Sequence, residues 1–419
     1  MSKQPPALPS LNRVKRQDEI ITETREYTVI TPIYGGGVDA GKPDEVTPIR
    51  VPTIRGHLRF WWRATRGAAC KNTHDLHAKE SAIWGSTEQP SCVQITVEMT
   101  QASKPFTLPS SIQHHGQPVQ NIGHFKSPYS YAAFPAQSEP IFEPLWGHQF
   151  KLTLRYPSSL KAEVEAALWA WSCFGWIGAR GRRGFGALQL RKRDGVEVKY
   201  PEKADKLCAK LQEELKHYAL AAGGKIEMPI LHGARLRCIG ENKQAEAIWS
   251  NLLQRYKNFR QQRNQGTHPT PGRSKWPEPD AIRAITRQSA PAHRAPVVHV
   301  SGKVIRRFPR AFFGLPIIFH FKQGREPEKK GEPSDVELRP FDWDRMASPL
   351  ILRPFHTGSN VVGMALVLRA PFPFADDLLL NKSGSKDKQS ARVTPQEADA
   401  IVPLNGEADP LQAFLNSLK

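Results

Sequence analysis

The stretch "KLTLRYPSSLKAEVEAALWAWSCF" (residues 151–174) decides the fold, because it joins a strand pattern directly to a helix pattern. "KLTLRY" (151–156) is typical of a strand. In "SLKAEVEAALWAWSCF" (159–174) the hydrophobic residues recur at the spacing of a helix. These residues are Leu160, Val164, Leu168 and Trp171. The stretch therefore predicts one strand followed by one helix.

Segments on both sides extend this pair into a larger unit. "YTVITPIY" (27–34) and "CVQITVEM" (92–99) are strand candidates, and a helix is predicted from Ile54 onward. "GALQL" (186–190) supplies the last strand. The order strand, helix, strand, strand, helix, strand is that of a ferredoxin-like domain, which we expect to occupy residues 1–225.

The second half of the chain repeats part of this pattern. "ARLRCIG" (234–240) predicts a strand, and "AEAIWSNLLQRYKNFRQQR" (245–263) predicts a helix with one hydrophobic face. Further strand candidates are "LPIIFHF" (315–321), "PLILRPF" (349–355) and "VVGMALVLRA" (361–370). We expect an α+β fold in which residues 226–419 form a second ferredoxin-like domain with long loops. The predicted loops are 100–148, 266–296 and 380–400.

Composition bounds the class of protein. A chain of 419 residues exceeds what one hydrophobic core usually supports, so two or three domains are expected. The 59 Lys and Arg against 40 Asp and Glu leave a formal charge of +19, which indicates a polyanionic partner such as nucleic acid or an acidic membrane surface. Five cysteines without CxxC spacing, and no apolar run long enough to span a bilayer, predict a cytoplasmic protein.

The segment "TPIRVPTIRGHLRFWWRATRG" (47–67) holds five arginines and no acidic residue. At about 100° per residue, four of the arginines fall within about 80° of one another and form one stripe. The stripe consists of Arg55, Arg59, Arg63 and Arg66, and the opposite face consists of Leu58, Trp61, Ala64, Thr65 and Ala68. Gly56 is expected at the helix start, where free backbone N–H groups bind anions. Trp62 lies at the boundary. The alternative is a solvated basic face with tryptophans in the core.

A second basic motif, "GARGRRGFGALQL" (178–190), combines glycines with arginines. Its candidate RNA-binding residues are Gly178, Arg180, Arg182, Arg183, Gly184, Phe185 and Gly186. The portion from Arg183 to Gly186 matches the start of the RNA-recognition signature, but Ala187 and Leu190 replace its later aromatic residues. We therefore expect contacts to the RNA backbone, with Phe185 the one stacking residue. The alternative is a glycine-rich turn with solvent-facing arginines.

Catalytic signals are weak. "GGVDAGK" (36–42) satisfies part of a nucleotide-binding P-loop, but Pro43 replaces the required hydroxyl residue, so a flexible turn is predicted instead. His57 is a candidate general base for a metal-independent ribonuclease, although its helical angle favours a packed histidine. Neither zinc spacing nor a carboxylate motif for two-metal cleavage is found in the sequence. We expect no cofactor and no small-molecule substrate.

Four stretches together resemble one family, the first Cmr subunits of type III-B CRISPR effector complexes in the RAMP superfamily. They are "ITPIYGGG" (30–37), "TPIRVPTIRGHLRFWWRAT" (47–65), "GARGRRGFGAL" (178–188) and "ASPLILRPF" (347–355). The resemblance covers about the first 190 residues and a short later block. It leaves residues 100–148 and 196–345 poorly covered.

The resemblance implies two ferredoxin-like domains and a noncatalytic place near the 3′ end of a guide RNA, with target cleavage assigned to another subunit. The implied partners are CRISPR guide RNA, target RNA and other Cmr subunits. Carried over by position, the helix motif contributes Arg55, Gly56, Arg59, Trp62 and Arg63, and the glycine-rich loop contributes Gly178, Arg180, Arg182, Arg183, Gly184 and Gly186.

Our leading hypothesis is a sequence-independent RNA binder that works through phosphate contacts in antiviral defence. Two alternatives stay open: a metal-independent endoribonuclease on the same fold, and a peripheral membrane protein that uses the tryptophan-rich helix.

Overall fold

The computed structural model describes residues 19–37, 44, 46–137, 144–266, 272–321, 331–384 and 386–419. Most of the flexible turn predicted for residues 36–42 lies outside these ranges. No helix in the described ranges is long and apolar enough to cross a membrane.

The first sheet has the predicted ferredoxin-like topology. Its strands are β1 (Ile20–Val29), β2 (Gln94–Gln101), β7 (Gln149–Pro157), β8 (Leu188–Arg193) and the short β9 (Val196–Glu197). Their order is β2-β7-β1-β8-β9, and all neighbours are antiparallel. Helix α1 (Val51–Thr65) follows β1, and α3 (Lys161–Phe174) follows β7. The α+β fold class and the order strand, helix, strand, strand, helix, strand are confirmed.

The boundaries of β1 and α1 differ from the prediction. Strand β1 ends at Val29, and the residues up to Tyr34 form isolated bridges, Ile33 with Leu145 and Tyr34 with Ala179. Helix α1 begins at Val51, because Pro52 suits the first turn of a helix, where its missing N–H costs nothing. Gly56 therefore lies in the second turn and is not at the helix start.

The second sheet contains three strands in the order β10-β16-β15, all antiparallel. They are β10 (Ile230–Asn242), β15 (Leu350–His356) and β16 (Val361–Arg369), and helix α5 (Ala245–Arg260) follows β10. A ferredoxin-like sheet has four strands, and three of them are present here. No described strand pairs with the free edge of β10, where the fourth strand would lie. Helix α4 (Ala204–Tyr218) packs against β10.

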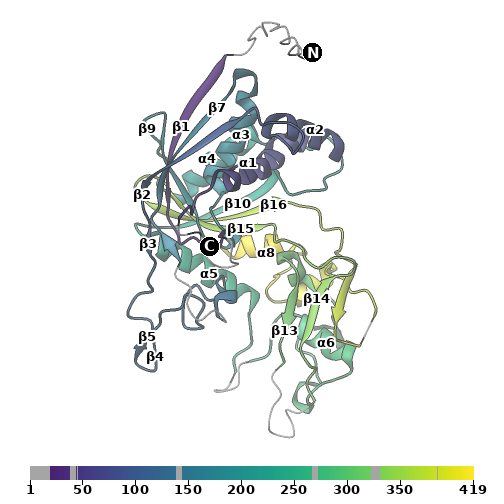
Figure 1. Cartoon of the computed structure of the whole chain (residues 1–419). Helices are drawn as coiled ribbons and strands as arrows, with labels where there is room; N and C mark the ends of the chain where they lie inside the picture. The colour runs from purple at the N-terminus through teal and green to yellow at the C-terminus, as the bar shows by residue number, and fades with distance from the viewer. Residues whose placement is uncertain are drawn as a thin grey trace, which may run out of the picture.

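Helices α1, α3 and α4 lie between the two sheets (Figure 1). One hydrophobic core runs from Leu152 of β7 through Trp171 of α3 and Leu211 of α4 to Leu366 of β16. Neighbouring side chains of β16 point the other way, and Val367 belongs to a separate core. The predicted domain division near residue 225 remains a prediction. Both halves of the chain contribute residues to the first core.

The second core lies behind the second sheet. There, α5 and α8 (Pro410–Ser417) cover the strands (Figure 1). The predicted hydrophobic face of α5 is confirmed, because its residues Ile248, Leu252, Tyr256 and Phe259 are all buried in this core. Strands β15 and β16 are therefore covered on both faces.

Two predicted loops contain a helix. Residues 266–296 include α6 (Glu278–Thr286). Trp276, just before this helix, and Ile282 within it are fully buried. Residues 380–400 overlap the end of β17 (Leu378–Asn381) and contain α7 (Pro395–Ala400), which Thr394 and Glu397 begin with a capping box. Strand β17 joins β13 (Ile317–Phe319) and β14 (Val336–Pro340) in a small lobe with its own core.

The remaining elements are short, apart from a helix that the sequence reasoning missed, α2 (Thr73–Trp84). Its start is marked by Asn72, whose side chain accepts a hydrogen bond from the Asp75 N–H. The short strands are β3 (Lys104–Pro105), β4 (Gln113–His114), β5 (Gln117–Pro118), β6 (Leu145–Trp146), β11 (His299–Val300) and β12 (Lys303–Val304). The first four lie in the predicted loop of residues 100–148, part of which packs as a third core against α5.

Candidate nucleic-acid interface

The stripe on α1 meets carboxylates that come from other elements. Arg59 and Arg63 both contact Glu80 of α2, which is 4% exposed, and the distance from Arg63 Nη1 to Glu80 Oε1 is 2.9 Å. Arg66 Nε lies 3.1 Å from Glu163 Oε1 of α3. The segment itself holds no acidic residue, but Glu80 and Glu163, which are distant in sequence and adjacent only after folding, partly compensate the stripe.

Arg55 is the stripe arginine without an ion pair among the described residues. Its Nε is buried and has no hydrogen-bond partner. Together with Arg59 it lines a depression of about 360 Å³ between α1 and the end of α2. The other lining residues are Trp84, Gly85, Ser86, Thr87, Gln89, Pro90 and Ser91. The depression thus offers one uncompensated cation amid hydroxyl and amide groups, which suits a phosphate.

Gly56 is exposed beside Arg55, and a Cβ added there would meet nothing within 4 Å. Packing inside the protein therefore does not require glycine at this position. The open surface permits close approach of an external backbone, although the helix N-terminus is a turn away.

The tryptophans of α1 belong to the core. Trp61 is fully buried, and Trp62 is 2% exposed, with its Nε1 donating to Glu163 Oε2 over 2.6 Å. Trp62 therefore presents no ring for base stacking in this structure, which corrects its place in the predicted RNA-binding set. The same burial argues against the membrane-surface alternative, since neither tryptophan ring can enter a lipid interface.

The glycine-rich loop connects the first domain to the second sheet. Arg182 donates to the carbonyl of Ser348, and Arg183 Nη1 donates to the carbonyl of Leu350 over 2.9 Å. Arg180 donates to the carbonyl of Ala132. These arginines are half-buried and hold backbone carbonyls, so the solvent-facing turn does not form. No carboxylate among the described residues forms an ion pair with these arginines, so their positive charge is not compensated.

Phe185 is fully buried, packed edge-on against Trp249 of α5 at a centroid distance of 4.8 Å. The prediction that it stacks on bases is wrong in this structure, because the third core encloses the ring. The glycines here have packing roles. Gly184 and Gly186 have positive φ, and Gly178 has φ +80° with Tyr34 O 2.7 Å from where a Cβ would lie.

Arg353, within the quoted "ASPLILRPF" stretch, was not selected from the sequence. It is 1% exposed, and its guanidinium donates to the carbonyls of Gly175, at 2.7 Å, and of Leu188. Burial lowers the pKa of Arg353 to about 10. Arg353 therefore connects β15 to the first domain. A single arginine within a strand pattern does not predict such a contact.

His57 does not provide an accessible base. It is half-buried, and its ring lies edge-on to Trp176 at a centroid distance of 5.7 Å. Burial lowers the pKa of His57 to about 4, so the imidazole is neutral at physiological pH and poorly matched to general-base catalysis. Within the described ranges, no group of three or more His, Cys, Asp and Glu side chains could hold a metal ion.

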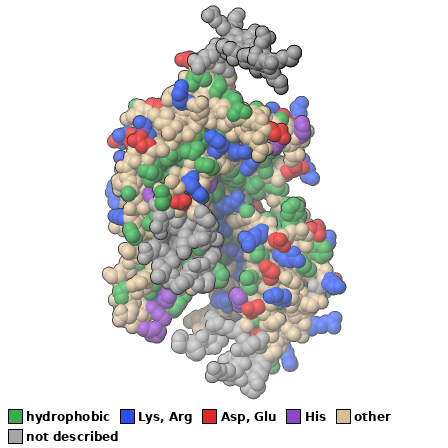
Figure 2. Space-filling view, in the orientation of Figure 1, with side chains coloured by type: hydrophobic (Ala, Val, Ile, Leu, Met, Phe, Trp, Pro, Cys, Tyr) green, Lys and Arg blue, Asp and Glu red, His purple; other side chains and the backbone are tan. Residues whose placement is uncertain are grey.

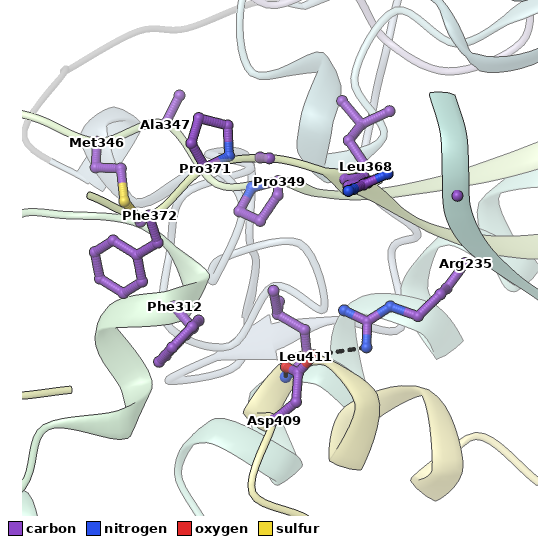
Figure 3. A pocket seen from close by; sticks show the side chains of 13 residues that line it. Arg235, Phe312, Met346, Ala347, Pro349, Leu368, Pro371, Phe372, Asp409 and Leu411 are labelled. Carbon is purple, nitrogen blue, oxygen red and sulfur yellow. Dashed lines mark hydrogen bonds and ion pairs between the residues drawn. The ribbon is translucent and has the colours of Figure 1, made fainter. Parts of the chain in front are cut away.

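A separate pocket of about 230 Å³ opens beside the second sheet, where β10 and β16 meet α8 (Figure 3). Phe312, Met346, Phe372 and Leu411 give it an apolar wall. Arg235 at its edge is already paired with Asp409 over 2.6 Å. Its lining residues Ala347 and Pro349 belong to the quoted "ASPLILRPF" stretch, but the sequence did not predict a pocket there.

The fold and this surface define an α+β protein with a ferredoxin-like domain and arginines concentrated near α1 and the glycine-rich loop. Residues 26–189 match the family model of the RAMP superfamily. The curated protein CRISPR system Cmr subunit Cmr1-1 from Pyrococcus furiosus is 26% identical over 148 residues, or 35% of this chain. The alignment spans 41% of that relative's length.

Two solved structures are similar to the chain. One is the crystal structure of apo Cmr1 from Pyrococcus furiosus, with a TM-score of 0.48, 18% identity, and coverage of 87% of this chain and 94% of that one. The other is a chain in a cryo-EM structure of type III-B Cmr-beta bound to cognate target RNA. It has a TM-score of 0.47 and 9% identity, covering 95% of this chain and all of that one.

Proposed function

We propose that this protein is a noncatalytic RNA-binding subunit of a type III-B Cmr CRISPR effector complex. It holds guide RNA, target RNA or their duplex through phosphate contacts, while base pairing supplies the sequence specificity. The RAMP match and the relative Cmr1-1 support the class of assembly. The net charge of +19 supports a nucleic-acid partner.

The observation that most supports RNA binding in this proposal is the depression beside α1. Arg55 has an unsatisfied buried Nε there, and Gly56 leaves the neighbouring surface open. Arg59 and Arg63 share one carboxylate, so the three arginines together keep a net charge of about +2 after Glu80 is counted. A phosphodiester seated at Arg55 would be attracted by all three.

The first prediction is that Arg55→Gln weakens binding of an oligouridylate. Loss of one phosphate contact should lower the slope of log affinity against log salt by about 0.7, or about fivefold in affinity near 0.1 M salt. Fluorescence anisotropy over a salt series measures both. Arg155→Gln is the matched control, because Arg155 is exposed on β7 and forms no ion pair in the described chain.

Equal weakening by both variants would show a general charge effect and contradict the site. The noncatalytic role is tested by incubating labelled RNA with the protein in EDTA, where defined cuts would favour the ribonuclease.

Sequencing the RNA that copurifies with the tagged protein tests the assembly. Guide RNAs with a shared repeat-derived tag are expected, whereas bulk ribosomal RNA would contradict the proposal.

A further inference from the structure

A second group of arginines gathers where three segments meet. Arg183 comes from the glycine-rich loop, Arg260 ends α5, and Arg310 lies in the short helical turn of residues Pro309–Phe313. The Tyr256 hydroxyl oxygen accepts hydrogen bonds from Arg183 Nη2 at 3.1 Å and Arg260 Nη1 at 3.4 Å. We call this set, with Arg182 and Arg263 beside it, the junction cluster.

The junction cluster is poorly compensated. Among the described residues, the one carboxylate paired with it is the fully buried Glu278, 3.1 Å from Arg310 Nε. Its other members donate to neutral groups. Arg182 and Arg183 donate to backbone carbonyls, and Arg263 Nη1 donates to the carbonyl of Gly272 over 3.3 Å. Five guanidinium groups therefore share one negative charge.

The local chemistry shows the cost of this arrangement. Burial, with a further contribution from the neighbouring Arg183, lowers the pKa of Arg182 to about 10. The Nε of Arg260 is buried without a hydrogen-bond partner. On α1 the same protein pairs half-buried arginines with Glu80 and Glu163. Neutral acceptors hold the junction cluster in place without balancing its charge, so an external anion would be bound favourably.

The position of the cluster indicates how large that anion is. Figure 2 shows Lys and Arg side chains in the hollow that separates the small lobe from the rest of the molecule. The turn containing Arg310 leads into this lobe, while Arg263 is exposed past the end of α5. Tyr131, half-buried, packs edge-on to Tyr256 at 5.6 Å. Charge spread over three segments beside an aromatic ring suits a chain of phosphates with bases rather than a single small anion.

We propose that the junction cluster is a phosphate-binding site for a single-stranded segment of RNA, separate from the depression at Arg55. The planar guanidinium groups of Arg260 and Arg263 receive successive phosphodiesters, and Tyr131 lies beside the base between them. This inference rests on the proposed function, because it assumes that the protein binds RNA.

The test compares two double variants on the same helix and its end. Arg260→Gln with Arg263→Gln removes two charges from the cluster, and Arg255→Gln with Lys257→Gln removes two charges outside it. For oligouridylate, the cluster variant should lose about 1.4 from the salt slope and about 25-fold in affinity near 0.1 M salt. The control should retain the wild-type slope. Equal losses in both variants, or no loss in the cluster variant, overturn the site.

A footprint on the wild-type protein covers the case in which the cluster variant fails to fold. An arginine-modifying dicarbonyl reagent is applied with and without oligouridylate, and modified peptides are quantified by mass spectrometry. RNA should protect Arg263 and leave Arg255 reactive, and equal reactivity of Arg263 in both samples overturns the proposal.

If wild-type protein binds no RNA, the proposed function itself fails. If binding depends on Arg55 but not on the cluster, this inference alone fails.

Discussion

Glu80 shows how a single residue changes the meaning of a basic motif. Its carboxylate is 4% exposed and receives both Arg59 and Arg63. From the sequence, the stripe on α1 looks like four free cations. In the structure, two of them share one internal anion, a third is paired with Glu163, and Arg55 alone keeps its full charge for a ligand.

We predict that Glu80→Gln has opposite effects on stability and RNA binding. Removing one member of a buried ion pair costs several kcal/mol, but Arg59 and Arg63 are about one third exposed, so solvent screening reduces the loss to about 2 kcal/mol. RNA affinity should rise, because the two arginines gain net positive charge. Urea unfolding and anisotropy measure the two quantities.

Glu98→Gln is the control for this prediction, since Glu98 is exposed on β2 and pairs with no described cation. It should change the free energy of unfolding by less than about 0.5 kcal/mol. A Glu80→Gln protein that binds RNA more weakly than wild type would contradict the charge argument.

At the scale of the element, the glycine-rich loop is a packed joint. Thr31 Oγ1 donates to the carbonyl of Gly184 over 2.6 Å, and Trp249 Nε1 of α5 donates to the carbonyl of Arg183 over 2.7 Å. A Cβ at Gly186 would lie 1.9 Å from the Ile177 carbonyl oxygen. The glycines therefore let three segments come together, and the loop's arginines reach the junction cluster as a result.

We predict that Gly186→Ala is strongly destabilising. The left-handed backbone at φ +61° costs an alanine about 1 kcal/mol, and the overlap with Ile177 adds about 2 kcal/mol or more. Gly195→Ala is the matched control, because Gly195 has φ +80° but no atom within 4 Å of the added Cβ. It should lose only the backbone part, as measured by urea unfolding. Equal losses would show that packing at Gly186 is unimportant.

For the whole molecule, the shared core is the decisive feature. Leu211 of α4, Trp171 of α3 and Leu366 of β16 belong to one hydrophobic cluster, although they come from opposite sides of residue 225. Separating the halves would expose to water the face of the second sheet that packs against α1 and α4, together with the apolar helix surfaces that it covers. The two ferredoxin-like patterns therefore depend on each other for burial.

We predict that a chain divided at residue 225 does not give two stable domains. Neither fragment 1–225 nor fragment 226–419 should show cooperative urea unfolding alone, whereas the first core of the full chain should unfold in one transition. Tryptophan fluorescence and far-ultraviolet circular dichroism of the full chain should then coincide. A fragment that unfolds cooperatively on its own would contradict the shared core.

The sequence by itself determined the elements whose signal is periodic. Hydrophobic spacing located α3 and α5, and the order of elements in residues 27–190 predicted the first sheet. Helix α6, by contrast, was hidden in a segment rich in proline and basic residues. Its stability comes from the burial of residues such as Ile282, which local spacing did not reveal.

Only the tertiary structure decided which charges are free. Ion pairs such as Arg63 with Glu80, and contacts such as Arg353 with Gly175, join residues that are far apart in the chain. Trp62 and Phe185 were judged from their neighbours in sequence, but their burial depends on distant elements that cover them. Periodicity follows from the local geometry of the backbone, whereas electrostatic compensation depends on three-dimensional distance, and this chain sets that distance through its shared core.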